Sequence, residues 1–526
     1  MISIIPYPKE LKILSGYIEL QNFKEIVYPR ALENLARYGQ KIFDQDWDWN
    51  LAINLNTQQT KNAIILKLDP KFEIETYSLI IKPEEIEIKG SSGSGIFYGI
   101  QSFRQILFQY NLEHFSKLSS NQDFTLKCPQ IEIVDSPRFS WRGFMLDEGR
   151  YFLGKETVKK TLDWMAFYKL NRLHWHLTED QGWRIEIKKY PKLTTIGASR
   201  QGTPKLRNRE VGHDGKSLSG YYTQAEIKEI IAYANERYIE IIPEIEFPGH
   251  AQAALAAYPE LSCTGGPFEV STKWGVHKEV FCLGNNLTIP FMKDILTEVC
   301  ALFPSKWIHL GGDEVPKDRW NACPKCQAKI QQDQLTDAHH LQITFTNEMV
   351  AFLAEKNKQT ICWNEVTDDR LDKRTISQYW KGKFENIQEF LREGGRTIIS
   401  PSNKYYVDVS YQFSPLDACY NFEPVPPGTS DQITKQIMGI ESEMWGEVFQ
   451  TEKKMEWCAL PRTLAIAESA WSTPENKNFE RFLDVLTSHF RILDSFHINY
   501  ASLRESNPSL WQKMKKLLKI GHNYYA

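Results

Sequence analysis

Short apolar runs alternate with amphipathic segments along the chain from about residue 140 onward. The apolar runs have the length and residue types of buried strands, and the segments between them have helical apolar spacing. Strands are expected at residues 141–146, 172–177, 239–245, 307–311, 360–363, 375–380, 397–400 and 438–445. Helices are expected at residues 155–169, 223–237, 287–302, 338–356 and 384–393. This alternation predicts an α/β fold, and a set of eight strands favours a closed (β/α)8 TIM-type barrel over an open doubly wound sheet.

The first 135 or so residues have a different pattern. Alternating positions at residues 63–68, 77–81 and 85–89 predict strands of an antiparallel sheet. Residues 91–95 (SSGSG) are expected to form a flexible turn, and residues 96–109 have helical apolar spacing. We therefore expect a small α+β domain over residues 1–135 and the barrel with C-terminal helices over 136–526. Cys128-Pro129 and Ser136-Pro137 mark the passage between them.

Composition and charge narrow the class of protein. A hydrophobic content of 42% and a charged content of 25% are typical of a soluble globular protein. The net charge is −3 without a basic stripe, which argues against nucleic acid as a partner, and no run reaches the ~18 apolar residues of a membrane span. No signal peptide is expected in the chain as given, so a native Met1 would indicate the cytoplasm and a trimmed chain a periplasmic or secreted protein. The oligomeric state is not encoded in any pattern that we identify.

The 9 cysteines are too few for a disulfide scaffold. Cys323-Pro-Lys-Cys326 is a CxxC motif, but no second motif follows at zinc spacing, so an exposed loop is favoured over a metal or redox site. Cys263 and Cys282 bracket a loop and could pair in an oxidising compartment.

Polar and aromatic residues stand where almost every expected barrel strand ends. They are Asp147, Glu148 and Arg150; His174, His176, Glu179 and Asp180; Glu244, Glu246 and His250; Asp313 and Glu314; Trp363, Asn364 and Glu365; Tyr379 and Trp380; Tyr406 and Asp408; Trp445 and Glu447. The carboxyl ends of barrel strands are where loops converge on a substrate. Tryptophan at such positions, among 15 in the chain, favours stacking against flat apolar faces such as those of sugar rings.

The most informative strand end is KWIHLGGDEV, where two glycines precede the adjacent carboxylates Asp313 and Glu314. By itself this pair is equally consistent with a helix N-cap and with acid/base chemistry. His174 and His176 lie on one face of an apolar strand, which favours buried, hydrogen-bonded histidines over metal ligands. No HExxH motif is present, and no metal or cofactor is expected.

With these motifs in order, the chain resembles the family 20 glycoside hydrolases, the β-N-acetylhexosaminidases. The matching motifs are GRYF (149–152), HWHLTEDQGWR (174–184), PEIEFPGH (243–250), HLGGDEV (309–315), QYW (378–380), YYVD (405–408) and MWGE (444–447). The first domain also resembles the small domain that precedes the barrel in this family. The resemblance implies removal of terminal, non-reducing β-linked N-acetylglucosamine or N-acetylgalactosamine, with retention of configuration, from an oligosaccharide or glycoconjugate.

The resemblance also implies substrate-assisted catalysis, in which the 2-acetamido carbonyl of the sugar is the nucleophile and an oxazoline-type intermediate forms. Glu314 would be the general acid and then the base, with a pKa raised by its neighbour, and Asp313 would stay ionised and orient the acetamide. Tyr406 would donate to the acetamide oxygen. The apolar walls around the acetamido methyl group would be Trp363, Trp380 and Trp445. The ring hydroxyls would be bound by Arg150, Asp408 and Glu447. A relay near Glu314 would consist of His250, Glu179 and Glu246.

Two features depart from the family pattern. Glu179 and Glu246 stand where members usually have Asp, and residues 411–422 lack a Trp that members often carry. Two other readings stay open: a carbohydrate-binding protein on an inactive barrel, and a retaining glycosidase for sugars without a 2-acetamido group. The natural glycan, its linkage and the preference between gluco and galacto sugars are not predicted.

Overall fold

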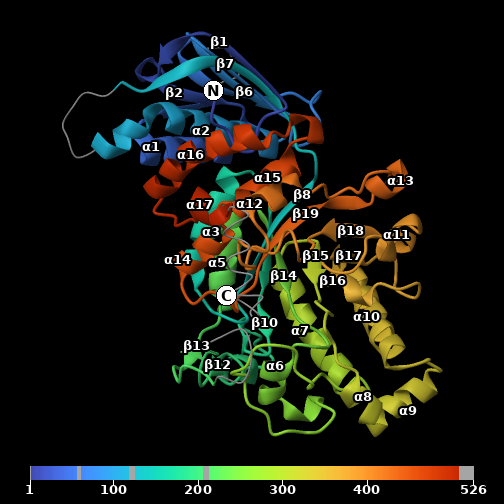
Figure 1. The fold of residues 1–526 in the computed structure, drawn as a ribbon. Helices are drawn as coiled ribbons and strands as arrows, with labels where there is room; N and C mark the ends of the chain where they lie inside the picture. The colour runs from blue at the N-terminus through green and yellow to red at the C-terminus, as the bar shows by residue number, and fades with distance from the viewer. Residues whose placement is uncertain (1, 56–60, 118–124, 205–211, 509–526) are drawn as a thin grey trace.

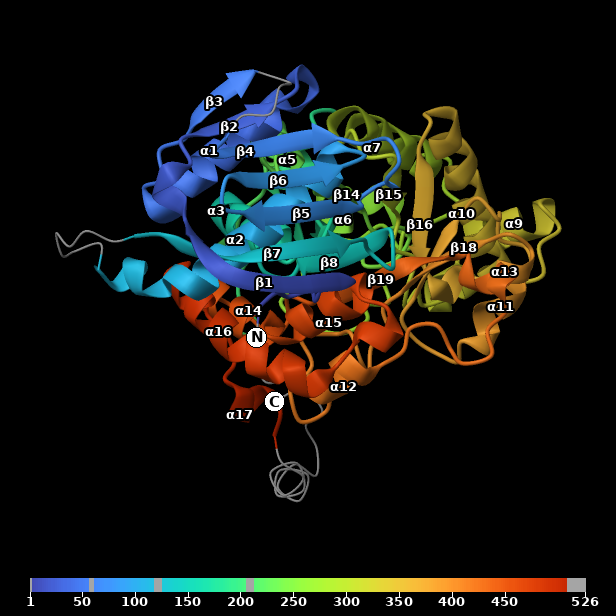
Figure 2. The same cartoon turned by 90° about the horizontal axis from the view of Figure 1, so that it is seen from above.

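The computed structural model describes residues 2–55, 61–117, 125–204 and 212–508. It contains a closed barrel of eight parallel strands and, beyond one end of it, a seven-stranded sheet, with helices α1 and α2 between the sheet and the barrel (Figures 1 and 2). The predicted fold class, a (β/α)8 barrel preceded by a small α+β domain, is confirmed.

The barrel strands close in the order β14-β15-β16-β17-β18-β19-β8-β9. Each lies at a position that the apolar runs predict, with boundaries that differ by a few residues at most. Their bounds are β8 Trp141–Asp147, β9 Arg172–His176, β14 Glu240–Glu244, β15 Trp307–His309, β16 Gln359–Trp363, β17 Ile376–Tyr379, β18 Arg396–Ile399 and β19 Ile437–Met444.

The five predicted helices are also present, as α3 Lys155–Phe167, α5 Gln224–Asn235, α7 Thr288–Leu302, α10 Ala338–Glu355 and α11 Glu385–Arg392. Shorter elements decorate the loops: α4 Lys192–Thr195, α6 Gln252–Ala257, α8 Asp318–Ala322, α9 Pro324–Gln332, α12 Leu416–Asn421, α13 Asp431–Thr434, and the short strands β10 Thr178–Glu179, β11 Gly182–Trp183, β12 Ser199–Arg200 and β13 Leu218–Ser219. The C-terminal helices are α14 Glu452–Ala459, α15 Arg462–Trp471, α16 Phe479–Ser495 and α17 Leu503–Ser506.

The sheet of the first domain is mixed, so the prediction of an antiparallel sheet is wrong. Its order is β1-β7-β5-β6-β4-β2-β3, and β4 pairs in parallel with both β6 and β2. Period-two alternation is the same for both kinds of pairing, which is why the sequence pattern did not separate them. The elements are β1 Glu10–Glu19, β2 Glu25–Tyr28, β3 Ala52–Leu55, β4 Ala63–Leu68, β5 Tyr77–Lys82, β6 Glu85–Gly90, β7 Lys127–Asp135, α1 Glu33–Trp47 and α2 Gly93–Lys117.

Two local predictions in this domain are also corrected. The predicted turn over residues 91–95 ends early, because α2 begins at Gly93. A Cβ on Gly95 would lie 2.4 Å from the Thr76 carbonyl oxygen, so the glycine allows close backbone approach at the start of the helix. Cys128-Pro129 lies inside β7 and not between domains; Pro129 pairs with Tyr17 where the register of β1 shifts, a place where a strand tolerates proline.

The first domain contacts the barrel at the amino ends of its strands. Arg142, near the start of β8, binds Glu75 at 2.9 Å, and the buried Lys169, just before β9, lies 3.0 Å from Asp135. The loops that follow β14 and β15 lie at the other end of the molecule in Figure 1. The carboxyl ends of the barrel strands are therefore free of the first domain.

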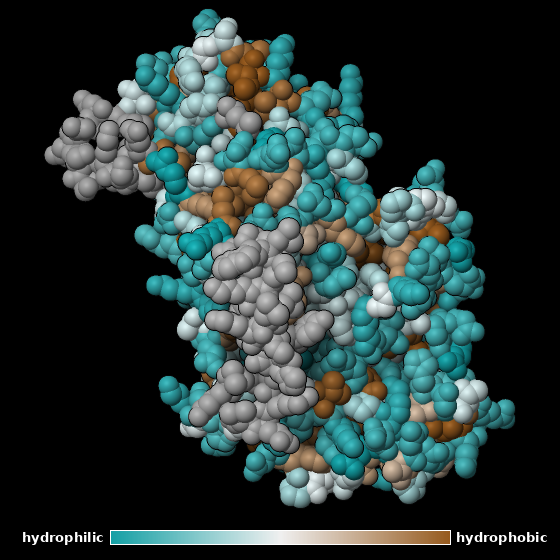
Figure 3. Space-filling model, in the orientation of Figure 1, coloured by the Kyte–Doolittle hydropathy of each residue, from teal (hydrophilic) through white to brown (hydrophobic). Residues whose placement is uncertain are grey.

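On the face shown in Figure 3, apolar residues form separate patches among hydrophilic ones. Among the helices of the described residues, none is long and apolar enough to cross a membrane.

The interpretation of Cys323-Pro-Lys-Cys326 as an exposed loop is wrong. Both cysteines are buried at the start of α9, next to Cys263 and Cys282. All four are thiols that form no disulfide.

Candidate active site

A tight turn after β15 presents the acidic pair at the barrel mouth. Gly311 and Gly312 have φ angles of 64° and 92°, in the left-handed region that favours glycine. A Cβ on Gly311 would lie 1.8 Å from a carboxylate oxygen of Glu246, so that position also requires the absence of a side chain. Glu314 itself has a φ of 49°, which is uncommon for a residue with a side chain and is often found at functional sites.

The two carboxylates have different surroundings. The side chain of Asp313 is 11% exposed, whereas that of Glu314 is 36% exposed. Burial, opposed by the positive charge of His250 and reinforced by Glu314, raises the pKa of Asp313 to about 7. No hydrogen-bond partner for the Asp313 Oδ1 atom exists within the described ranges, although this atom is buried. Asp313 is thus placed to accept a hydrogen bond from a ligand. Glu314 is placed to contact a ligand from the solvent side.

His250 lies between the acidic pair and the buried carboxylates of Glu179 and Asp180. Its Nε2 atom lies 3.7 Å from Asp313 and 3.8 Å from Glu314, while its Nδ1 atom lies 3.0 Å from Glu179. Burial lowers the pKa of His250, but Glu179 and Asp180 outweigh burial and raise that pKa well above its ordinary value. The imidazole therefore carries a positive charge at neutral pH.

Glu179 continues this chain of charges. It lies 2.6 Å from Arg150, whose guanidinium also contacts Asp147 at 3.1 Å and lies 3.9 Å from Glu447. Although burial raises the pKa of Glu179, Arg150 and His250 hold that pKa well below its usual range. Arg150 therefore links Glu179, which lies behind the acidic pair, to Glu447, which follows β19.

Glu246 occupies a different place from the other two members of the predicted relay. Its carboxylate accepts a hydrogen bond of 3.2 Å from the Gly312 N–H, and its backbone N–H donates to the Thr178 hydroxyl. Burial, followed by the charges of Asp313 and Glu244, raises the pKa of Glu246 well above its ordinary value. The structure brings Glu246 against the glycine turn and Glu179 against His250.

An aromatic cluster stands beside the acidic pair. Trp363, Tyr406 and Trp445 pack together with Met145, and Trp380 packs against them from a partly exposed position. The rings of Trp380 and Tyr406 stack at 6.0 Å with an angle of 13°, and the Trp445 ring lies 6.0 Å from Tyr406. These rings supply flat apolar walls of the kind that enclose a methyl group or a sugar face.

Tyr406 keeps its proton in this cluster. Burial raises the pKa of Tyr406 well above its usual range, and the negative charges of Glu443, Asp313 and Asp408 add to that effect. The phenol is therefore a hydrogen-bond donor at any working pH. Asp408, two residues along, is buried as well. The structure thus brings all of the predicted catalytic and sugar-binding residues to one end of the barrel, and their roles stay predictions.

Below the mouth, the barrel interior is a layer of charged groups. Glu244 contacts three histidines: His174 at 2.9 Å, His309 at 2.9 Å and His176. It also accepts a hydrogen bond of 2.8 Å from the indole of Trp363. On the far side, His174 lies 2.8 Å from Glu441, to which Gln378 also donates. The prediction that His174 and His176 are buried and hydrogen-bonded is confirmed.

The sequence pattern placed Glu244 at a strand end but gave it no role. The structure shows that it holds the Trp363 ring in place and that Asp180 supports His250 at 3.3 Å. Glu244 and Asp180 both belong to the pattern of polar residues at the strand ends, which also contains histidines that they bind. That shared pattern is the signal that could have revealed their roles.

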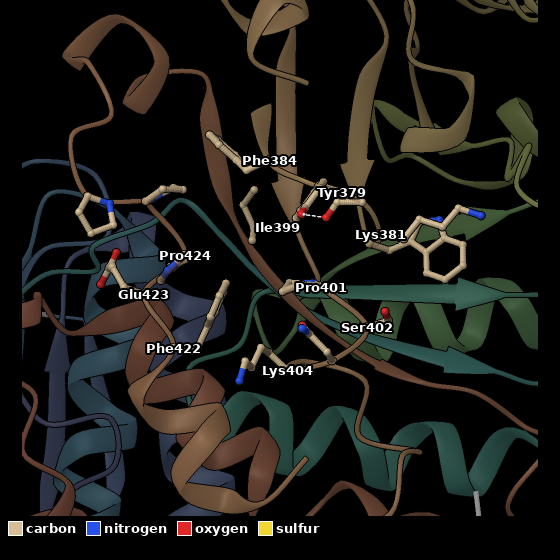
Figure 4. A pocket seen from close by; sticks show the side chains of 15 residues that line it. Tyr379, Lys381, Phe384, Ile399, Pro401, Ser402, Lys404, Phe422, Glu423 and Pro424 are labelled. Carbon is tan, nitrogen blue, oxygen red and sulfur yellow. Dashed lines mark hydrogen bonds between the residues drawn. The ribbon is translucent and has the colours of Figure 1, made fainter. Parts of the chain in front are cut away.

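A pocket of about 460 Å³ lies beside the aromatic cluster (Figure 4). It is lined by Tyr379, Phe384, Ile399, Phe422 and a run of prolines, with Lys404 and Glu423 at its edge. Trp380 belongs to this lining and also stacks on Tyr406, so one indole is shared by the pocket and the aromatic cluster.

A closed barrel with an acidic pair, a buried histidine–carboxylate chain and aromatic walls at its carboxyl end is the arrangement of a barrel glycoside hydrolase. The model of the glycosyl hydrolase family 20 catalytic domain matches residues 139–474, and the model of domain 2 of that family matches residues 1–136. The chain belongs to glycosyl hydrolase family 20.

Similar proteins agree with this membership. A beta-hexosaminidase of Porphyromonas gingivalis is 35% identical over 516 residues, which cover 95% of this chain and 64% of that protein. A beta-hexosaminidase of Akkermansia muciniphila is 31% identical, with coverages of 87% and 92%. The crystal structure of a beta-N-acetylhexosaminidase from Bacteroides fragilis has a TM-score of 0.81 at 31% identity and covers 99% of both chains. The exo beta-N-acetylglucosaminidase of Vibrio harveyi, in complex with N-acetylglucosamine, has a TM-score of 0.83 at 28% identity, with coverages of 95% and 78%.

Proposed function

We propose that the protein is a β-N-acetylhexosaminidase that removes terminal, non-reducing N-acetylglucosamine or N-acetylgalactosamine from oligosaccharides or glycoconjugates by substrate-assisted catalysis. The observation that carries this proposal is the placement of the buried Asp313 and the more exposed Glu314 beside the cluster of Trp363, Trp380, Tyr406 and Trp445. The names of the similar proteins support the same activity.

In this proposal the aromatic cluster encloses the methyl group of the 2-acetamido substituent. The Tyr406 hydroxyl donates to the acetamide oxygen, and Asp313 Oδ1 accepts from the acetamide N–H. These two contacts turn the carbonyl oxygen toward the anomeric carbon, so the attack is intramolecular and needs no second reactant. The negative charge of Asp313 also stabilises the positive charge that develops on the acetamide.

Glu314 serves as the general acid that protonates the leaving oxygen. Its exposed position suits a group that must reach the aglycone and then a water molecule. After the aglycone leaves, the same carboxylate accepts a proton from water, which attacks the anomeric carbon and regenerates the acetamide with retained configuration. Behind the acidic pair, His250 carries a positive charge and Glu179 a negative charge, and these charges keep the two carboxylates in position.

A single experiment tests the proposal against its two rivals. The full chain is incubated with an aryl N-acetyl-β-glucosaminide and with the matching β-glucoside, and the anomer first released is identified by proton NMR. We expect turnover of the N-acetyl substrate alone, release of the β-anomer, and inhibition by a thiazoline that mimics the oxazoline intermediate. Binding without turnover would leave a carbohydrate-binding protein, and β-glucoside turnover that resists the thiazoline would leave an ordinary retaining glycosidase.

A further inference from the structure

Four cysteine sulfurs meet at one point outside the candidate active site. Cys282 Sγ lies 3.7 Å from that of Cys323 and 3.6 Å from that of Cys326, and Cys263 Sγ lies 3.9 Å from that of Cys326. All four sulfurs lie within 4.8 Å of one another. Three of these residues are buried and Cys263 is half-buried.

These distances are those of a metal tetrahedron. Zinc binds thiolates at about 2.3 Å in a tetrahedral site, and a tetrahedron of that size has sulfur–sulfur edges of about 3.8 Å. Cys282 is equally close to two other sulfurs, so the group does not divide into two pairs. A set of four sulfurs is the ligand set that selects zinc or iron.

The surrounding backbone is shaped for this convergence. Cys323 is the N-cap residue of α9 and Cys326 lies in its first turn, where free backbone N–H groups favour negative charge on a thiolate. A Cβ on Gly284 would lie 2.2 Å from the backbone of Lys325, so this glycine lets the segment after Cys282 pass directly over the CxxC turn. The Cys282 N–H donates to the Leu261 carbonyl, which keeps the first two cysteine segments side by side.

We propose that Cys263, Cys282, Cys323 and Cys326 bind one structural Zn²⁺ ion. Four protein ligands leave no open coordination position, so the ion would not contact the substrate. Its effect would be to join two loops. Cys263 and Cys282 lie in the loop after β14, and Cys323 and Cys326 follow the acidic pair after β15.

Both joined loops carry residues of the candidate active site. The Phe281 N–H, next to Cys282, donates to the Pro248 carbonyl, two residues before His250. The Trp320 indole, three residues before Cys323, donates to the Phe281 carbonyl at 2.9 Å. A zinc ion at this point would therefore fix the loop of His250 relative to the loop of Asp313 and Glu314.

The test measures metal content in the full chain, purified without chelators and without an immobilised-metal column. We expect one zinc per chain by elemental mass spectrometry, and a loss of at least tenfold in zinc content in Cys282→Ser. Cys263→Ser, at the half-buried position, is the second variant if Cys282→Ser does not fold. Cys300→Ser is the matched control, because Cys300 lies in α7 outside the cluster and should leave the zinc content unchanged.

Two further readouts do not depend on activity. Cobalt exchanged into the protein should give the thiolate-to-cobalt charge-transfer band and the intense visible bands of a tetrahedral sulfur site, absent in the Cys282→Ser variant. Zinc removal should lower the unfolding temperature, and added Zn²⁺ but not Mg²⁺ should restore it. A metal-free native protein, equimolar iron in place of zinc, unchanged zinc in both cysteine variants, or a disulfide among these cysteines in unreduced peptides would each overturn the proposal.

Discussion

The Nε2 atom of His250 lies 3.7 Å from the Oδ2 atom of Asp313. This histidine is charged at neutral pH because Glu179 and Asp180 face its other ring nitrogen. Burial raises the pKa of Asp313 to about 7, and the positive charge of His250 opposes this rise because it stabilises the carboxylate. The ionisation of Asp313 is therefore balanced near neutrality in the free protein.

The first prediction concerns pH. The folded pKa of Asp313, about 7, lies above its ordinary value of 3.8, so the proton is held more tightly in the folded protein and the carboxylate forms only as pH rises through about 7. We expect kcat/KM to fall below this pH, because a protonated Asp313 does not accept from the acetamide N–H. The acid limb of kcat should lie at lower pH, since the bound N–H stabilises the carboxylate. Steady-state rates across pH measure both limbs.

Asp313→Asn provides the comparison for that profile. It should slow the first chemical step and lose the acid limb near pH 7. An Asp313→Asn protein as active as the parent on an N-acetyl substrate would require the substrate-assisted mechanism to be abandoned.

The second prediction separates Glu314 from its neighbour. Replacing Glu314 with Gln removes the proton donor, so turnover of a substrate with a poor leaving group, such as an alkyl glycoside, should fall by about 10²–10⁴. A nitrophenyl glycoside, whose leaving group needs little protonation, should lose far less. Substrate binding, measured by calorimetry with a slowly turned-over glycoside, should be spared. Glu355→Gln, on the exposed end of α10, is the control; an equal loss on both leaving groups would remove Glu314 from the acid role.

The third prediction concerns the aromatic pocket. Trp445→Ala should enlarge the space beside Tyr406 and raise KM for the N-acetyl substrate, while the N-propionyl analogue loses less. A methylene in an apolar pocket is worth about 1–3 kcal/mol, which sets a change of roughly 10–200-fold in the ratio of kcat/KM between the two analogues. Trp457→Ala, in α14 against Tyr411, should leave that ratio unchanged. An unaltered ratio in Trp445→Ala would mean that the acetamido group lies elsewhere.

The fourth prediction tests the junction between the domains. Lys169 and Asp135 have fully buried side chains 3.0 Å apart, and Lys169→Met leaves a buried carboxylate without its cation. We expect a loss of about 3–5 kcal/mol in the free energy of unfolding, measured by denaturant titration. Lys61→Met removes the exposed Lys61–Glu84 pair, whose side chains are 79% and 63% accessible, and should cost at most about 1 kcal/mol. Equal effects of the two variants would contradict the structural role of the buried pair.

The barrel could be predicted from the sequence because its strands are buried on both faces. Such strands have short apolar centres, for example Ile241-Ile242 in β14 and Ile398-Ile399 in β18, and the polar residues that meet at the mouth stand at or just after the strand ends. The mixed sheet of the first domain could not be predicted in this way, because a strand such as β4 has the same alternation whichever direction its neighbours run.

The site was predictable as a set of residues but not as a set of charges. Asp313 and Glu314 are adjacent in sequence, and only the fold makes one buried and the other exposed. The cysteine cluster was missed for a related reason. Its first two members come from one loop and its last two from another, at a spacing that matches no zinc pattern, and only the contact between those loops brings the sulfurs together.

The contact of the first domain with the amino ends of the barrel strands has a practical consequence. The outer strand β1 carries exposed side chains such as Lys12, 72% accessible, on the part of the molecule furthest from the loops of the acidic pair (Figure 1). A resin or sensor surface coupled at this lysine would hold the protein by its base and leave the barrel mouth open to large glycans.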